Sequence, residues 1–186
     1  MDARKTLSEL SDVAAAFFAA RSAAFTAALE ALVASLEGGG KVLLFGNGGS
    51  AAEAQHFAAE LVNKFLRVRP ALAALALTTD TSCLTSIGND VSYDVVFSRQ
   101  VEALGRPGDV AVGLTTSGDS PNVIEGLQAA RRKGLRTIAL TGEGGGKAKP
   151  LADILLDVPS RSTPRIQEVH LLVLHLLAEG VEERLA

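Results

Sequence analysis

The stretch Lys41-Val-Leu-Leu-Phe-Gly-Asn-Gly-Gly-Ser50 decides the fold class. Its first half, residues 41–45, is a short apolar run, and such a run predicts a buried β-strand. Residues 46–49 form a glycine-rich turn, and Ser50 is expected to be the N-cap of a helix that continues to about Lys64. A buried strand that leads through a tight turn into a helix is typical of a parallel α/β sheet.

The same order of strand, turn and helix repeats along the chain. Further strands are expected at 73–77, 110–114, 136–140 and 154–158, and helices at 6–36, 93–104, 121–133 and 163–183. Pro121 suits the first position of its helix. The prediction is a flavodoxin-like, doubly wound parallel sheet of five strands with helices on both faces and an extra N-terminal helix.

Composition narrows the class of protein. Hydrophobic residues make up 47% of the 186-residue chain but aromatic residues only 4%, so its apolar side chains are mostly small. Ala-rich helices of this kind often complete their burial at a subunit interface. No linker divides residues 1–186, so one domain is expected, with the helix of residues 1–37 at an oligomer interface. The net charge is −3, and the one tight basic cluster, residues 131–133, ends a predicted helix, so nucleic-acid binding is not expected.

Cysteine content and hydropathy indicate the cellular compartment of the protein. Cys83 is the single cysteine, which excludes an intrachain disulfide and favours a reducing compartment. The apolar run 13–20 follows basic residues, as in a signal peptide, but Arg21 ends it after eight residues. A membrane-spanning helix needs about 20 apolar residues. We therefore predict a cytoplasmic protein without a membrane partner.

Two strand-to-helix turns are suited to a phosphorylated ligand. The glycines of residues 46–50 allow close backbone approach at a helix N-terminus, although a ligand-free tight turn has the same pattern. Residues 115–121, Thr-Thr-Ser-Gly-Asp-Ser-Pro, offer four hydroxyls at a second helix start, where an N-cap needs one. Carboxyl ends of parallel strands share one edge, so both turns are expected there. Neither turn has the P-loop lysine or the dinucleotide-binding glycine pattern, and together they indicate a phosphorylated sugar.

All three histidines fall on two of the predicted helices. His56 and Glu60 are four residues apart and share a face of the first. The last helix carries His170 and His175, together with the neighbouring pair Gln167-Glu168. Gln167 and His175 are separated by about 12 Å of helix rise and about 80° of rotation. Spacing alone leaves open a solvated His–Glu pair and a hydrogen-bonded core histidine, but the concentration on two helices favours a functional role for at least two histidines.

Further motifs accompany these turns and helices. They are Gln-His-Phe-Ala-Ala-Glu at 55–60, Thr-Thr-Asp at 78–80, Gly-Asn-Asp at 88–90, Phe-Ser-Arg-Gln-Val at 97–101, Thr-Ser-Gly-Asp-Ser-Pro-Asn at 116–122 and Arg-Ile-Gln-Glu-Val-His at 165–170. With the turn at 46–50 they resemble the signatures of the phosphoheptose isomerases, a family of the sugar-isomerase (SIS) domain class. The resemblance runs from about Gly38 to His175. Pro164 and Lys64 depart from it, since some members carry an acidic residue and an arginine there.

The resemblance implies conversion of D-sedoheptulose 7-phosphate to D-glycero-D-manno-heptose 7-phosphate, the entry step to heptoses of surface glycans such as lipopolysaccharide. It also implies a homotetramer with sites near subunit boundaries and one zinc ion per subunit. By the resemblance, Glu60 is the base and His175 the acid, and the zinc ligands are His56, Glu60, Gln167 and His175. Substrate contacts fall on Asn47, Gly48, Gly49, Glu60, Asn89, Asp90, Thr115, Thr116, Ser117, Ser120 and Gln167.

Three alternatives share part of this pattern. One non-catalytic SIS subgroup binds a bacterial replication-initiator protein and has a similar first signature, but it lacks the carboxylate and histidine that stand here at Glu60 and His175. A sugar-phosphate-sensing regulatory domain usually has a DNA-binding segment, for which we expect no room ahead of Lys41. An isomerase of another ketose phosphate would share nearly all of these residues.

Overall fold

A computed structural model describes residues 2–186 and contains one five-stranded parallel sheet. Its strands are β1 (Val42–Gly46), β2 (Ala74–Ala76), β3 (Val110–Thr115), β4 (Arg136–Thr141) and β5 (Ile154–Asp157). The strand order β2-β1-β3-β4-β5 confirms the flavodoxin-like prediction. Gly46 lies opposite Leu114 in the register of β1 and β3. The turns that follow these two strands therefore emerge at the same edge, as expected.

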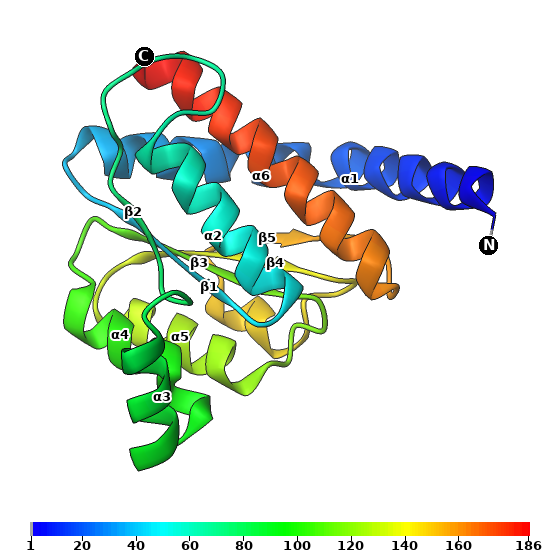
Figure 1. Cartoon of the computed structure of the whole chain (residues 1–186). Coiled ribbons are helices and arrows are strands. Elements are labelled where there is room, and N and C mark those ends of the chain that lie inside the picture. Colours follow the sequence, from blue (N-terminus) through cyan, green and yellow to red (C-terminus); the bar gives the residue numbers. More distant parts are fainter. Residues whose placement is uncertain (1) are drawn as a thin grey trace.

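Helices cover both faces of the sheet (Figure 1). One layer contains α1 (Ala3–Glu37), α2 (Gly49–Val62) and α6 (Thr163–Leu185), and the other contains α3 (Thr81–Asp90), α4 (Val96–Leu104) and α5 (Pro121–Arg132). Alternate residues of each strand pack into two apolar cores, one on each face of the sheet. Leu44 faces the first layer of helices and Leu43 faces the second. This two-sided burial explains why the strands are continuously apolar.

The expected N-cap of α2 was wrong. The cap is Gly48, with φ 55° and ψ −119°, and the helix begins at Gly49. Ser50 is buried inside the first turn and makes no capping bond. Glycine reaches this backbone conformation without the clash that a Cβ would cause, so the chain turns there before the helix starts.

The segment after β2 also differs from expectation. α3 was not predicted, although Asp80 caps it by accepting a hydrogen bond from the backbone N–H of Cys83 (2.9 Å). The helix expected at 93–104 begins instead as a 3₁₀ turn, Tyr93–Val95, and becomes α-helical at Val96. A second 3₁₀ helix, Gly146–Leu151, follows β4. Seven of the ten residues of α3 are Thr, Ser, Gly, Asn or Asp, which have low helix propensity, so residue preference did not indicate a helix there.

The long helix α1 lies along the body, where Phe17 is fully buried, and its first turns project beyond the sheet (Figure 1). It contacts α6 and β5, and Arg21 donates a hydrogen bond through Nη2 to Oδ2 of Asp157 (3.0 Å). In the described part of the chain, α1 is the one helix long and apolar enough to span a bilayer by length and composition. Only 22% of its most apolar window is buried in the single chain.

We expect Asp157→Asn to lower the free energy of unfolding by about 1–2 kcal/mol at pH 7, because a charge-assisted hydrogen bond to a partly solvated arginine is lost. Burial raises the pKa of Asp157, but hydrogen bonding and charge from Arg21, with backbone N–H groups, outweigh burial and lower the pKa below its usual value. The contribution is therefore complete above the unfolded pKa of about 4 and disappears as pH falls through the folded pKa. Urea denaturation at pH 7 and pH 3 measures both effects.

The control is Glu143→Gln, which removes an ion pair with Arg161 whose side chains are 50% and 90% exposed. Its expected effect is below about 0.5 kcal/mol. An equal loss of stability in both variants would show that Asp157 does not anchor α1.

Candidate active site between α2 and α6

Two neighbouring helices bring three ionisable side chains to one point. His56 and Glu60 lie one turn apart on α2, and His175 projects from α6, which packs against α2. The Nε2 atoms of His56 and His175 are 2.9 Å apart. Oε1 of Glu60 lies 2.8 Å from Nε2 of His56 and 3.5 Å from Nε2 of His175. The structure therefore joins a pair expected from its spacing to a histidine far away in sequence.

The burial of this trio suits a reactive site. The Glu60 side chain is 11% exposed, whereas those of His56 and His175 are 48% and 35% exposed. Oε2 of Glu60 is buried and has no hydrogen-bond partner in the structure. Such an oxygen is costly unless a further group satisfies it. The trio therefore combines access from solvent with an unsatisfied carboxylate oxygen.

The same trio could hold a metal ion. One ligand atom from each of His56, Glu60 and His175 lies within 4.8 Å of the other two. Two ligands at about 2.1 Å from a tetrahedral ion stand about 3.4 Å apart, close to the separations seen here. Two imidazoles and a carboxylate form an ordinary donor set for zinc.

Phe65 forms one wall of the site. Its ring stacks on the imidazole of His175 with centroids 5.5 Å apart and an interplanar angle of 21°. Phe65 follows α2, in a segment to which the sequence patterns assign no role. No local pattern marks it, because its partner lies on the last helix.

The other polar residues of α6 lie elsewhere. A Cβ added at Gly49 would come 2.4 Å from Nε2 of Gln167, so this amide packs over the start of α2 and is not with the trio. Glu168 is exposed and pairs with Arg165. His170 is fully buried and lies 3.1 Å from the carbonyl oxygen of Thr141 through Nε2. Of the three histidines, two therefore meet at the site and one belongs to the core.

Asn47, in the turn after β1, is held by residues that were not predicted to belong to the site. Its amide nitrogen donates to Oδ1 of Asn122 (2.8 Å), and the Asn122 nitrogen donates back to Oδ1 of Asn47 (2.9 Å). The hydroxyl of Tyr93 donates to the same Asn47 oxygen (3.3 Å). Asn122 is buried, and the signal for it was its place directly after Pro121 in the hydroxyl-rich turn.

The turn after β3 forms a compact set of hydroxyls. Oγ1 of Thr115 lies 2.9 Å from Oγ of Ser120 and 3.3 Å from Oγ of Ser117. Gly118 has φ 75°, and a Cβ there would come 2.4 Å from the carbonyl oxygen of Gly145, so only glycine fits without displacing the loop. The remaining predicted contacts include Thr116, whose carbonyl accepts from Gly142, and Asn89 and Asp90, which are exposed and bond to each other.

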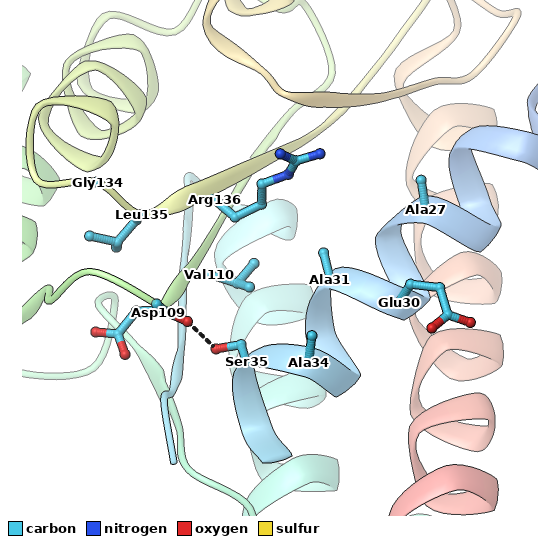
Figure 2. Close-up of a pocket in the computed structure, with 11 residues that line it drawn as sticks. Ala27, Glu30, Ala31, Ala34, Ser35, Asp109, Val110, Gly134, Leu135 and Arg136 are labelled. Atoms are coloured by element: carbon cyan, nitrogen blue, oxygen red, sulfur yellow. Dashed lines mark hydrogen bonds between the residues drawn. The ribbon is translucent and has the colours of Figure 1, made fainter. Parts of the chain in front are cut away.

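A cavity lies at the opposite edge of the sheet from the turns after β1 and β3 (Figure 2). It has a volume of about 780 Å³ and lies between α1 and the first residues of β3 and β4, Val110 and Arg136. Its α1 wall is built from small residues such as Ala31, and the carboxylate of Asp109 beside it is already paired with Lys41 (2.6 Å). The cluster of two imidazoles and a carboxylate is on the α2–α6 side.

Similarity to known proteins agrees with this geometry. A model of the SIS domain matches residues 7–142. The phosphoheptose isomerase of Paramagnetospirillum magneticum is 60% identical over 158 residues, which are 85% of this chain and 82% of that relative. The chain belongs to the phosphoheptose isomerase family of SIS-domain proteins. The phosphoheptose isomerase of Desulfovibrio desulfuricans is 57% identical over 163 residues, 88% of this chain and 78% of the relative.

A solved structure of this family has the same architecture. The phosphoheptose isomerase of Neisseria gonorrhoeae aligns with a TM-score of 0.91 and 45% identity, and the alignment covers 97% of both chains. The predicted SIS fold with an added N-terminal helix is thereby confirmed.

Proposed function

We propose that the chain isomerises D-sedoheptulose 7-phosphate to D-glycero-D-manno-heptose 7-phosphate through an enediol, as the first step towards activated heptose precursors. The observation that carries the proposal is the meeting of Glu60 with His175 and His56 in a member of this family. A carboxylate beside an imidazole can take a proton from carbon and exchange one with oxygen, which this reaction requires.

Glu60 is the proposed base. It removes a proton from C1 of the ketose, and the electron pair of the C–H bond forms the C1–C2 double bond while the carbonyl oxygen on C2 accepts a proton from His175. In the second half, Glu60 returns its proton to C2 and His175 recovers one from the hydroxyl on C1. The two side chains thus end the cycle in their starting protonation states.

We further propose zinc as the metal, one ion per subunit, held by His56, Glu60 and His175. His175 would bind the ion only as the neutral imidazole, that is, in the state in which it has given up its proton. The buried, unpartnered Oε2 of Glu60 supports this assignment, as does the donor set. When bound, zinc would polarise the sugar's oxygen atoms and stabilise negative charge on them. Gln167, the fourth ligand implied by the resemblance, would join only by turning away from Gly49, where it now packs.

The phosphate and the sugar hydroxyls have proposed partners at the sheet edge. Thr115, Thr116, Ser117 and Ser120 surround the start of α5, where hydroxyls, backbone N–H groups and the helix dipole favour an anion. The remaining proposed contacts are Asn47, Gly48, Gly49, Glu60, Asn89, Asp90 and Gln167.

We propose that residues 1–186 form a single SIS domain. Four copies of the chain would assemble into a homotetramer, and the subunits would meet through α1. Most of the apolar window of α1 is not buried within the single chain, which supports an interface there. Glu60 is about 16 Å along α2 from Gly49, so within one subunit the base lies far from the turns proposed to bind the phosphate. A site completed by a neighbouring subunit would shorten this distance. Light scattering of the purified protein would measure the oligomer mass.

We assign the protein to the cytoplasm.

Incubation with sedoheptulose 7-phosphate tests the reaction, with aldose formation followed by NMR. Turnover that depends on added zinc after treatment with a chelator would support both reaction and metal. Absence of turnover with or without zinc would contradict this substrate assignment and direct attention to other ketose phosphates.

We expect Asn122→Ala to raise KM for the sugar phosphate by about 5- to 50-fold with a smaller change in kcat. The variant leaves the amide of Asn47 without its reciprocal partner, and an unsatisfied polar group costs about 1–3 kcal/mol. Steady-state kinetics measure the split between KM and kcat. Asn63→Ala, an exposed amide after α2, is the control, and an unchanged KM for Asn122→Ala would show that Asn47 needs no such support.

A further inference from the structure

One buried carboxylate near the end of α6 organises the segment that follows α2. The Glu182 side chain is 1% exposed, and its oxygens accept hydrogen bonds from the backbone N–H groups of Phe65 (2.6 Å), Leu66 (2.8 Å) and Arg67 (2.9 Å). Nε of Arg69 lies 3.3 Å from Oε1 of Glu182, an ion-pair distance. Figure 1 shows this segment beside the C-terminal turns of α6. A single side chain thus fixes the path of residues 65–69.

Two inward-pointing members of the segment reach the acid–base pair. Phe65 stacks on His175. Arg69, whose side chain is 1% exposed, donates through Nη2 to the carbonyl oxygen of Glu60 (2.7 Å) and through Nη1 to that of Leu61 (2.8 Å). We call these two side chains the arms of the segment. The Phe65 arm contacts the proposed acid, His175, and the Arg69 arm contacts the backbone of the proposed base, Glu60.

We propose that Glu182 is a positioning residue of the isomerase, which sets the orientation of His175 through Phe65 and the end of α2 at Glu60 through Arg69. This inference rests on the proposed function. Glu182 touches none of the reacting atoms and acts only through these two arms.

The rest of residues 65–69 is exposed, which indicates that Glu182 does more than hold an apolar segment against the core. Between the two arms, Leu66 is 63% exposed and Val68 is 91% exposed, so fixing this stretch buries little apolar surface. Burial by itself would raise the pKa of Glu182, but the three backbone hydrogen bonds and the charge of Arg69 lower it. The carboxylate is therefore ionised at neutral pH, and its electrostatic attraction is available to hold both arms in place.

Glu182→Gln tests the proposal, with Glu183→Gln as the matched control on the next residue. The amide keeps the size of the side chain but loses the charge and turns an NH₂ group towards backbone N–H groups. Glu183 is 56% exposed and pairs at the surface with Arg67, so its loss should change little. We expect kcat of Glu182→Gln to fall about 10- to 100-fold, since small misplacement of catalytic groups has effects of this size. For Glu183→Gln we expect a change within about twofold.

A second readout does not depend on turnover. The chain has three histidines, so ring signals can be assigned by single substitutions. In the wild type, the stacked ring of Phe65 should shift the His175 ring protons upfield, and Glu182→Gln should remove this shift. Phe65→Leu, which leaves Glu182 and its backbone bonds intact, should reproduce both the spectral change and the loss of kcat, even where Glu182→Gln folds poorly.

The outcomes separate the two hypotheses. If Glu182→Gln is less stable but keeps the His175 shift and the wild-type kcat, its role is structural and the proposal is wrong. A normal kcat for Phe65→Leu would likewise overturn the arm through His175. If the wild-type protein does not turn over the sugar phosphate, the proposed isomerase function is wrong. The NMR signals of His175 would still show whether Glu182 positions that ring.

Discussion

Glu60→Gln is expected to lower kcat by about 10²- to 10⁴-fold while KM changes little, because the amide has the shape of the carboxylate but cannot accept the proton from C1. Aldose formation measured by NMR gives the rate. A more direct readout is exchange of the C1 hydrogen of the ketose with deuterium from solvent. Wild-type protein should catalyse this exchange, and the variant should not, since exchange requires only removal and return of that proton.

The control for this variant is Glu168→Gln, the same change on an exposed residue of α6. It removes a partly exposed ion pair with Arg165 and should leave kcat unchanged within about twofold. If Glu60→Gln retained deuterium exchange at C1, another group would have to be the base. If zinc binding alone were lost, excess zinc would restore the rate, which we do not expect.

His175→Ala is expected to reduce kcat about 100-fold or more, because no other side chain of the trio is assigned to protonate the oxygen on C2. The ring is 35% exposed, so exogenous imidazole can reach the space left by the substitution. We expect imidazole to restore part of the activity in proportion to its protonated fraction. Zinc content per chain, measured by atomic absorption, shows how much of the loss comes from the metal site.

His170→Asn provides the contrast on the same helix. His170 is fully buried near the Thr141 carbonyl, so the variant should lower the free energy of unfolding but keep kcat. Equal losses of kcat in the two histidine variants would contradict the assignment of the acid to His175. A fully active His175→Ala protein would show that His175 is not the acid.

The positions of the strands could be predicted because the relevant information is local. The apolar run at 41–45 and the glycine-rich turn after it indicate one strand and its turn, and later strands repeat the pattern. Parallel strands need crossover helices, which leaves few possible topologies. The helix α3 was missed because most of its residues are Thr, Ser, Gly, Asn or Asp, whose low helix propensity hides the apolar pair Leu84 and Ile87 that packs on the core. The cap at Gly48 was also missed, since it depends on the backbone angle and not on a capping side chain.

For the candidate site, the sequence by itself determined that His56 and Glu60 share a helix face, because a spacing of four residues is one helical turn. The resemblance to the family added His175 to them. Only the tertiary structure showed that the His175 ring contacts this pair, that His170 lies in the core and that Gln167 packs over Gly49. These positions depend on how α6 rests against α2, which local spacing does not specify.

The support around the site was likewise decided by the tertiary structure. Glu182 binds backbone N–H groups more than a hundred residues away in sequence, and any residue type supplies such groups. Phe65 meets His175, and Asn122 meets Asn47, also across long separations in sequence, 75 residues in the second pair. Helical periodicity and turn chemistry act over a few residues and can be read from the sequence, whereas these contacts form only when the packed sheet brings distant segments together.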